Sequence, residues 1–558
     1  MPRPSIYTQT FDPLQEGTRA TGPSVDVAEV FHLVSWFRNI LRHDKGGKRV
    51  SGPFWYHDEF LPIASNAIEG ASRKMVGFCQ KRVREVTRHS HDGEIEVVPL
   101  MRALEHLPQL RHKGHEYCTP EFCYNASKDY TSVIQLHKCH SQNCATTTDN
   151  MFSQELLVAA LNNSSTAWKL DGMSFAQYRN YLAVSHVWAD GTGDGTWKKG
   201  RVNQCLWDFW VDIARRLECD GVWWDAVCIP KDKAARSIAL SNMHGNYERA
   251  KCTVVHDLYL AGIEWKNEES ACIALALSTW FTRGWTALEL FLSRRVFVLF
   301  RQGDGYILKD LDNEILAKHP VLDSHAHWIA TSYVRHLRKK SFESTSTLLS
   351  VLRPRSTSWV RDELIIAGLM CGIKDHVELS EQQITKRIMR QLFRIDRVCL
   401  LHGQPTMSEL QYSWCPTRFV NLPGTYDRHS DHLVIDDDGI LSWKLWEAWL
   451  ISKTHVDRGI IQPLSMDMGV QAQVQQALQK PEKHVILTCD SFDAQGFLVR
   501  PKADELHLKH RPIFCEYIGA VNVTPSAIRK IRDRCWVNIN IGYKPGMVDV
   551  EVVDWLSI

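Results

Sequence analysis

The chain has 558 residues, 44% of them hydrophobic and 23% charged, and a formal net charge of +2. A single hydrophobic core stops growing near ~250 to 300 residues, so this length predicts two or three domains. The near-neutral charge argues against nucleic acid as a partner, because non-specific phosphate binding requires a strongly basic surface.

No apolar stretch near the N-terminus has the length of a signal-peptide core, and no uninterrupted apolar run of 18 residues follows it. We therefore expect a cytoplasmic protein with no membrane span. In a reducing compartment the sixteen cysteines are expected as thiols, either as core residues or as metal ligands, and not as disulfides.

Residues 1–110 are expected to form an N-terminal helical region, because apolar residues recur at helical spacing in 27–41. A Cys/His module follows at 111–150. Its cysteines have the spacing Cys-x4-Cys-x15-Cys-x4-Cys and are Cys118, Cys123, Cys139 and Cys144, with His115, His137 and His140 interleaved. Paired soft ligands separated by a loop suit a structural Zn²⁺, held by the four cysteines or by three of them and a His. Buried thiols without metal are an equal alternative.

Residues 151–300 alternate between strand-like and helix-like patterns. Strands are predicted at 181–188, 221–229, 252–256 and 294–300, and the main helices at 153–163, 201–218 and 232–250. This alternation predicts an α/β domain with a mostly parallel, flavodoxin-like sheet flanked by helices, and a ligand beyond the carboxyl ends of the strands. Residues 301–400 are expected to be helical and 401–558 to be a mixed α+β region. The sequence assigns no role to either.

Three segments of the α/β region resemble, in chain order, the signature blocks of the fungal heterokaryon incompatibility (HET) domain. They are YLAVSHVW (181–188), the block at 223–257, and WFTRGWTALE (280–289). The first block departs from the common pattern, because His186 replaces a Tyr and Trp188 is followed by Ala189 and not directly by Gly. The resemblance implies a fungal protein of self/non-self recognition and programmed cell death, acting by self-association or with another incompatibility protein.

HET domains look distantly similar to TIR domains, several of which cleave NAD with a Glu four residues after a Trp. Trp285 and Glu289 have this spacing, and in a helix they share one face. The resemblance therefore implies a TIR-like sheet and an NAD glycohydrolase, with NAD as the substrate. Glu289 is then the carboxylate that stabilises the oxocarbenium-like ribose, and Trp285 or Trp188 holds the nicotinamide by stacking.

Further ligand-binding candidates end the predicted strands. Asp225 is expected near the carboxyl end of the second strand, where it can contact a ribose hydroxyl, cap the next helix or pair with an Arg. Ser185 and His186 are neighbours on a strand, so they face opposite ways and cannot form a catalytic pair, although one can line the pocket. The sequence GTGDG (191–195) resembles a phosphate-binding loop only weakly, and a mobile surface loop fits its turn residues better.

Two other functions remain open. The first is a non-enzymatic HET module that signals by self-association, in which Glu289 pairs with Arg283 or Arg294 and Trp285 lies in the core. The second and weaker one is a cysteine hydrolase built from Cys228, His256 and Asp257. Cys228 lies in an apolar run with nothing to lower its pKa, so a buried, inert thiol is the better interpretation.

Overall fold

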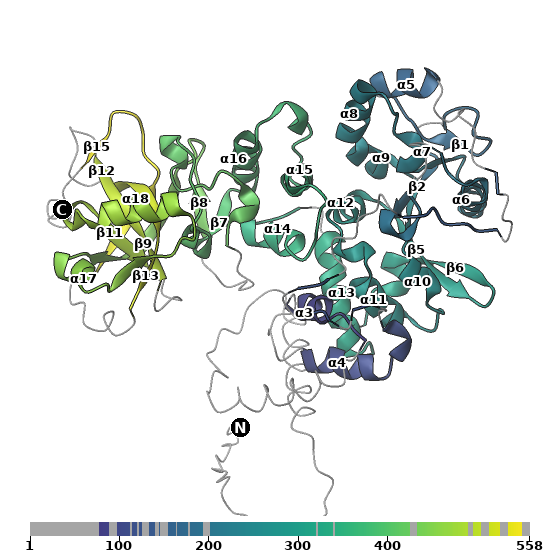
Figure 1. Cartoon of the computed structure of the whole chain (residues 1–558), viewed down its shortest axis with the longest axis horizontal. Coiled ribbons are helices and arrows are strands. Elements are labelled where there is room, and N and C mark those ends of the chain that lie inside the picture. The colour runs from purple at the N-terminus through teal and green to yellow at the C-terminus, as the bar shows by residue number, and fades with distance from the viewer. Residues whose placement is uncertain are drawn as a thin grey trace, which may run out of the picture.

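A computed structural model of the chain describes residues 77–88, 97–111, 114–115, 117–119, 122–124, 133–139, 144–145, 154–162, 164–176, 179–193, 201–319, 322–338, 341–423, 432–488, 495–503, 513–524 and 534–549. The predicted helix at 27–41 and His140 lie outside these residues. The described chain forms two mixed sheets with helices around and between them (Figure 1).

The first sheet has six strands in the order β1-β3-β2-β4-β5-β6. They are β1 Trp168–Lys169, β2 Tyr181–His186, β3 Gly221–Trp223, β4 Cys252–His256, β5 Val296–Gln302 and β6 Gly305–Asp310. The central strands β3, β2, β4 and β5 are parallel, whereas β1 and β6 pair antiparallel at the two edges. The sheet is therefore mixed, with a parallel centre.

Eight helices belong to the same part of the chain: α5 Gln154–Leu161, α6 Gln204–Arg216, α7 Asp225–Cys228, α8 Lys233–Ser241, α9 Met243–Arg249, α10 Leu258–Gly262, α11 Glu268–Leu277 and α12 Gly284–Leu292. Both faces of the sheet are covered, since Val254 and Val255 point to opposite faces of β4 and belong to different hydrophobic clusters. Trp210 of α6 packs in the cluster of Val254, and Leu288 of α12 packs in that of Val255. Burial on both faces explains why these strands are continuously apolar.

The second predicted strand is wrong in length. β3 ends at Trp223, and the chain then turns into the short helix α7, so 225–228 is helical. The predicted helix at 232–250 is two helices, because α8 ends at Ser241 and α9 begins at Met243. The Asp232 carboxylate starts α8 by accepting hydrogen bonds from two backbone amides. Apolar spacing continues across the break, so periodicity alone could not reveal it.

The sheet also extends past the strand expected to close it. After β5 the chain turns at Gly303, whose φ is +59°, and returns as β6 along the same edge. Glycine adopts this left-handed conformation without a steric penalty. The opposite edge is completed by the two-residue strand β1, which is too short to give a sequence signal.

Further helices pack beside this sheet. They are α3 Gln80–Arg88, α4 Val97–Glu105, α13 His325–Arg338, α14 Thr345–Leu352, α15 Val360–Met370 and α16 Glu381–Leu392. The N-terminal helices α3 and α4 contact α13, and α3 also contacts α11. Ser344 and Ser380 begin α14 and α16 with reciprocal capping hydrogen bonds.

The second sheet has nine strands, seven of which follow the order β10-β13-β12-β11-β9-β8-β7, while β14 pairs with β13 and β9, and β15 with β12. Its strands are β7 Arg394–Asp396, β8 His432–Ile435, β9 Leu441–Leu450, β10 Ile461–Pro463, β11 Val485–Thr488, β12 Gln495–Ala503, β13 Ile513–Val523, β14 Arg534–Ile541 and β15 Val548–Asp549. The helices α17 Lys453–Asp457 and α18 Met468–Leu478 accompany it. The two sheets lie at opposite ends of the long axis, with α14, α15 and α16 between them (Figure 1).

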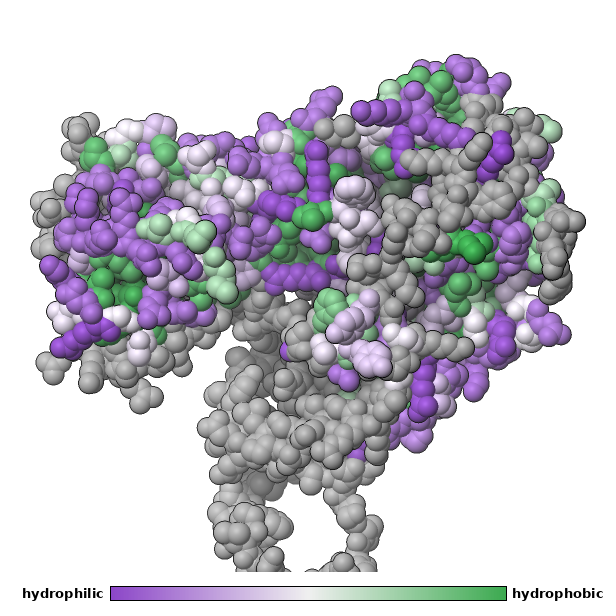
Figure 2. All heavy atoms as spheres, viewed as in Figure 1, coloured by the Kyte–Doolittle hydropathy of each residue, from purple (hydrophilic) through white to green (hydrophobic). Residues whose placement is uncertain are grey.

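The largest hydrophobic cluster runs through most of the molecule, from Phe78 to Ile541. Hydrophilic side chains predominate on the face shown in Figure 2, interrupted by small apolar groups. None of the helices in the described ranges is both long and apolar enough to cross a membrane.

Candidate functional site

Five of the predicted site residues lie where β2 and β3 end, in two groups: Ser185 contacts Glu289, and Asp225 contacts His186 and Trp188. Ser185 and His186 are the last residues of β2, and Asp225 begins α7 directly after β3. Glu289 lies in α12, the helix that packs beside this end of the sheet. The carboxyl ends of parallel strands are where α/β sheets bind ligands, so position alone makes this the candidate site.

Glu289 is buried, with 7% of its surface exposed. Ser185 Oγ donates a hydrogen bond to Glu289 Oε2, and Trp280 Nε1 donates to Ser185 Oγ at 2.7 Å. Burial raises the pKa of Glu289 to about 7, against the opposing effect of the Ser185 hydrogen bond. Near neutral pH this carboxyl group is therefore present in both its protonated and its ionised form.

His186 lies between a hydroxyl and a carboxylate. Its Nε2 is 2.7 Å from Asp225 Oδ1, and its Nδ1 is 2.8 Å from Thr192 Oγ1. Thr192 donates its hydroxyl proton to the Val187 carbonyl at 3.1 Å, so its oxygen is left to accept a proton from His186 Nδ1. Because Nδ1–H donates to Thr192, Nε2 must also carry a proton if it is to donate to the Asp225 carboxylate. The contacts therefore favour the doubly protonated imidazolium.

The pKa values agree with this ion pair. Burial on its own lowers the pKa of His186, but the charge and hydrogen bond of Asp225 outweigh burial and raise it. Burial likewise opposes ionisation of Asp225, yet His186 and the Trp188 indole lower the pKa of this carboxyl below its usual range. Trp188 Nε1 donates to Asp225 Oδ2 at 2.7 Å. Two carboxyl groups of one site thus have pKa values shifted in opposite directions, Asp225 down and Glu289 up.

The turn after β2 is packed tightly. Gly191 has φ +77°, and a Cβ atom there would be 2.6 Å from the Ile134 carbonyl oxygen. A Cβ atom at Gly193 would be 2.8 Å from the Trp188 ring. Residues 191–193 of the GTGDG segment therefore form a buried turn and not the expected surface loop, while 194–195 lie outside the described residues.

The two candidate stacking residues have different surroundings. Trp285 is half-buried, and its Nε1 donates to Asp362 Oδ2 at 2.8 Å, which ties α12 to α15. Trp188 is also half-buried, and its ring lies nearly parallel to the His186 ring, with centroids 6.4 Å apart. The indole of Trp285 thus has a structural contact of its own, whereas Trp188 belongs to the His186 and Asp225 network.

Cys228 and His256 show no sign of an activated nucleophile. Burial raises the pKa of the Cys228 thiol to about 12, and burial lowers the pKa of His256 to about 3. The Cys228 sulfur accepts a hydrogen bond from the Trp224 amide at 3.3 Å within its own segment. A reactive cysteine needs a stabilised thiolate, and this environment favours the neutral thiol.

Two groups of side chains could each hold a metal ion. The first is Cys79, His115, Cys118 and Cys123, and the second is His137, Cys139, Cys144 and Cys205. Within each group the four possible ligand atoms lie within 4.8 Å of one another. The structure thus divides the four cysteines expected at a single site between two groups, and adds one distant cysteine and one histidine to each.

Sequence reasoning missed both distant cysteines. Cys79 lies 36 residues before His115, and Cys205 lies 61 residues after Cys144, so neither belongs to a recognisable ligand spacing. It also missed Thr192 and Trp280, which reach the site only through the fold.

The family model for the heterokaryon incompatibility protein (HET) matches residues 181–261. The match begins at β2, includes Ser185, His186 and Asp225, and ends in α10 before Glu289. No curated protein and no solved structure was found to match the chain. Residues 181–261, which contain the parallel strands β2, β3 and β4, thus match the heterokaryon incompatibility (HET) family.

Proposed function

We propose that the protein is an effector of fungal self/non-self recognition and programmed cell death that cleaves NAD at the nicotinamide–ribose bond. The observation that supports this proposal is the buried Glu289 carboxyl group, which accepts a hydrogen bond from Ser185 at the carboxyl end of β2 and has a raised pKa. A carboxylate beside a ribose that develops oxocarbenium-like charge stabilises that charge.

The proposed reaction begins when the bond between the ribose C1 carbon and the nicotinamide nitrogen breaks. Its electron pair leaves with nicotinamide, which becomes neutral, and positive charge develops on the ribose. Water then adds to C1 and releases a proton, giving ADP-ribose. The ionised form of Glu289 stabilises the developing charge and accepts the proton from water. The leaving group needs no proton, so the ionised carboxylate is the active form.

Asp225 has a positioning role in this proposal. Its two oxygens are already engaged by His186 and Trp188, so it fixes the orientation of both rings and does not contact ribose itself. Trp188 then presents a half-buried ring on which nicotinamide can stack. The parallel centre of the sheet, with a glutamate on a nearby helix, is also the arrangement expected of a TIR-like domain.

The test is to incubate the purified full chain with NAD and follow nicotinamide release. Glu289→Gln keeps the size of the side chain and removes its charge, so we expect turnover to fall by about 100-fold or more. Glu268→Gln is the matched control, because this glutamate is exposed at the start of α11. No release by the wild type under self-associating conditions, or equal release by Glu289→Gln, defeats the proposal.

A non-enzymatic module that acts by self-association is the second candidate. Two observations favour this candidate: Glu289 is buried, and its hydrogen bond from Ser185 connects α12 to β2. In that case Glu289→Gln changes the oligomer size measured by light scattering, and neither protein releases nicotinamide. The absence of release by the wild type, together with the change in oligomer size, distinguishes this candidate from the enzyme.

A further inference from the structure

We propose that the chain binds two Zn²⁺ ions, each at its own structural site made of three cysteines and one histidine. The ligands of the first site are Cys79, His115, Cys118 and Cys123, and those of the second are His137, Cys139, Cys144 and Cys205.

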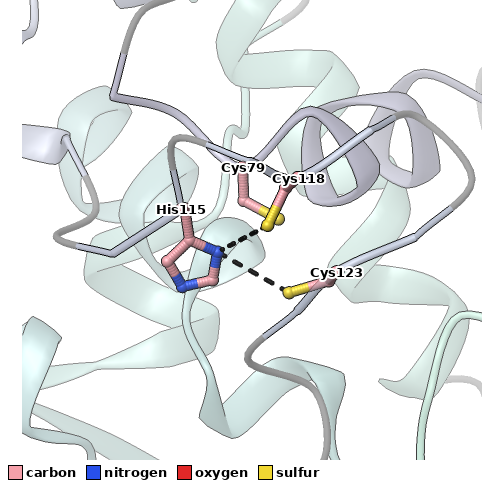
Figure 3. A group of neighbouring side chains, drawn as sticks. All are labelled: Cys79, His115, Cys118 and Cys123. Carbon is pink, nitrogen blue, oxygen red and sulfur yellow. Dashed lines mark hydrogen bonds between the residues drawn. The ribbon is translucent and has the colours of Figure 1, made fainter.

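The first site has the spacing of a tetrahedral zinc shell. Zn–S bonds of about 2.3 Å and Zn–N bonds of about 2.0 Å place a nitrogen and a sulfur ligand about 3.5 Å apart. His115 Nδ1 is 3.4 Å from Cys118 Sγ and 3.6 Å from Cys123 Sγ. All four side chains are buried and point toward one another (Figure 3). Four protein ligands leave no open position for water, so the metal is structural.

Packing alone does not account for this group. Its cysteines form a hydrophobic cluster of only three residues, Cys79, Cys118 and Cys123. The neighbouring aromatic residues are exposed and do not enlarge it: Tyr117 is 81% exposed, Phe122 55% and Tyr124 65%. A segment that cannot build a core is commonly held by a metal, which supplies the folding energy that apolar contacts lack.

The second site joins the Cys/His segment to the HET domain. His137 Nδ1 is 3.9 Å from both Cys139 Sγ and Cys205 Sγ, and the Lys138 amide donates to Cys205 Sγ at 3.2 Å. Amide hydrogen bonds to sulfur are the kind of outer contact that supports a metal-bound thiolate. Cys205 lies in the first turn of α6, so this group joins two separate segments of the chain.

Metal at the second site would hold the turn beside His186 in place. The same segment already bonds the HET domain on two sides, since the Gln204 amide donates to the Ala145 carbonyl at 2.8 Å and the Leu136 amide donates to the Gly191 carbonyl at 2.7 Å. The Gly191 turn carries Thr192, the hydroxyl partner of His186. The second ion would thus be linked to the candidate site through the Leu136–Gly191 hydrogen bond and the contact between Thr192 and His186.

The first test is elemental analysis of the purified full chain. We expect two zinc ions per chain, one after Cys79→Ser, one after Cys205→Ser, and none after both substitutions. Cys371→Ser is the control, because this half-buried cysteine caps α15 away from both groups and should leave two ions. If the wild type instead held one zinc ion per chain, and substitution of any one of Cys118, Cys123, Cys139 or Cys144 removed all of it, the cysteines would share one site and the proposal would be overturned.

The second test needs no variant and so does not depend on the variants folding. X-ray absorption at the zinc edge of the wild type should give an average shell of three sulfur atoms and one nitrogen atom. A shell of four sulfur atoms, a shell containing water oxygen, or less than one zinc per chain would contradict two such sites. These measurements do not use NAD, so their outcome is independent of whether the protein catalyses the proposed reaction.

Discussion

Burial of Glu289 disfavours the charged form of its carboxyl group, so the stability of the protein depends on pH through this residue. Its pKa rises from 4.5 to about 7 on folding. Above pH 4.5 the unfolded chain releases this proton while the folded chain still keeps it, so the stability from this group is present below pH 4.5 and is lost as the pH rises toward 7. A shift of this size corresponds to roughly 3 kcal/mol.

Glu289→Gln should therefore stabilise the protein at alkaline pH, because glutamine has no charge to bury. We expect its free energy of unfolding to exceed that of the wild type by up to about 3 kcal/mol at pH 8, with little difference at pH 4.5. Urea denaturation of both proteins at the two pH values measures this. If Glu289→Gln instead destabilised the protein at pH 8, the main contribution of the carboxylate would be its hydrogen bond with Ser185, which connects α12 to β2.

The same pKa sets the pH dependence of the proposed reaction. Since the ionised form of Glu289 is the active one, nicotinamide release should rise tenfold per pH unit below about pH 7 and level off above it. Other groups that act on this carboxyl are Asp225, His186 and Tyr247, and the pKa of His186 is raised while that of Asp225 is lowered, which favours the charged form of each. Initial rates from pH 5 to 9 give the profile. A rate that falls through pH 7 would require the protonated form.

Asp225 should control the charge on His186. Asp225→Asn keeps the shape of the side chain but removes the negative charge, so the pKa of His186 should drop as burial prevails. Removing one member of a buried pair commonly costs about 3 kcal/mol, and the partial exposure of Asp225 makes this an upper figure here. Nitrogen-15 shifts of the imidazole report the change. A His186 that stays doubly protonated in Asp225→Asn would contradict the ion-pair assignment.

At the scale of single residues, the sequence indicates candidates only through a motif or through the end of a predicted strand. Glu289 and Asp225 were predicted in this way. Trp280 and Thr192 were not, because their roles depend on contacts that no local spacing encodes. Trp280 reaches Ser185 across 95 residues of chain. Thr192 matters only because the turn at Gly191 brings its hydroxyl back to His186.

At the scale of elements, the turn after β2 can be tested with a matched pair of glycines. Both Gly191 and Gly303 have positive φ, but a Cβ atom at Gly191 meets the backbone of the adjacent segment, whereas one at Gly303 meets nothing within 4 Å. Gly303→Ala should thus cost only conformational strain, about 1 kcal/mol, and Gly191→Ala should cost more and displace residues 134–136. Thermal unfolding compares the two proteins. An equal decrease in thermal stability for both variants would mean that residues 134–136 can move away from a Cβ atom at Gly191 at no free-energy cost.

The central strands and the longer helices were predictable because burial imposes a pattern on each of them. The run at 252–256 is β4 to the residue, and α6 lies inside the helix predicted at 201–218. The sequence did not predict those elements whose formation depends on a tertiary contact. The strand β6 exists because it covers the open edge of β5, and α7 forms where Asp225 turns toward His186.

At the scale of the whole molecule, one hydrophobic cluster joins the helices that follow the HET match to the sheet at the C-terminus. Trp414 and Tyr517 belong to the same cluster as Leu275 and Leu288 of the first sheet's helices. The sequence suggested separate regions because its patterns report local structure, and contacts between regions leave no periodic signal. Substitutions in the C-terminal sheet can therefore affect the stability of the first sheet and its helices.

The family match ends at residue 261, but the sheet it belongs to does not. β4 pairs with β5, at 296–302, and β3 pairs with β1, at 168–169, so a polypeptide limited to 181–261 would expose unpaired backbone on both edges of a three-stranded parallel sheet. Open edges of apolar strands join those of other chains and aggregate. Such a piece should therefore elute as large assemblies in size-exclusion chromatography, and self-association observed with it would reflect the missing strands rather than signalling.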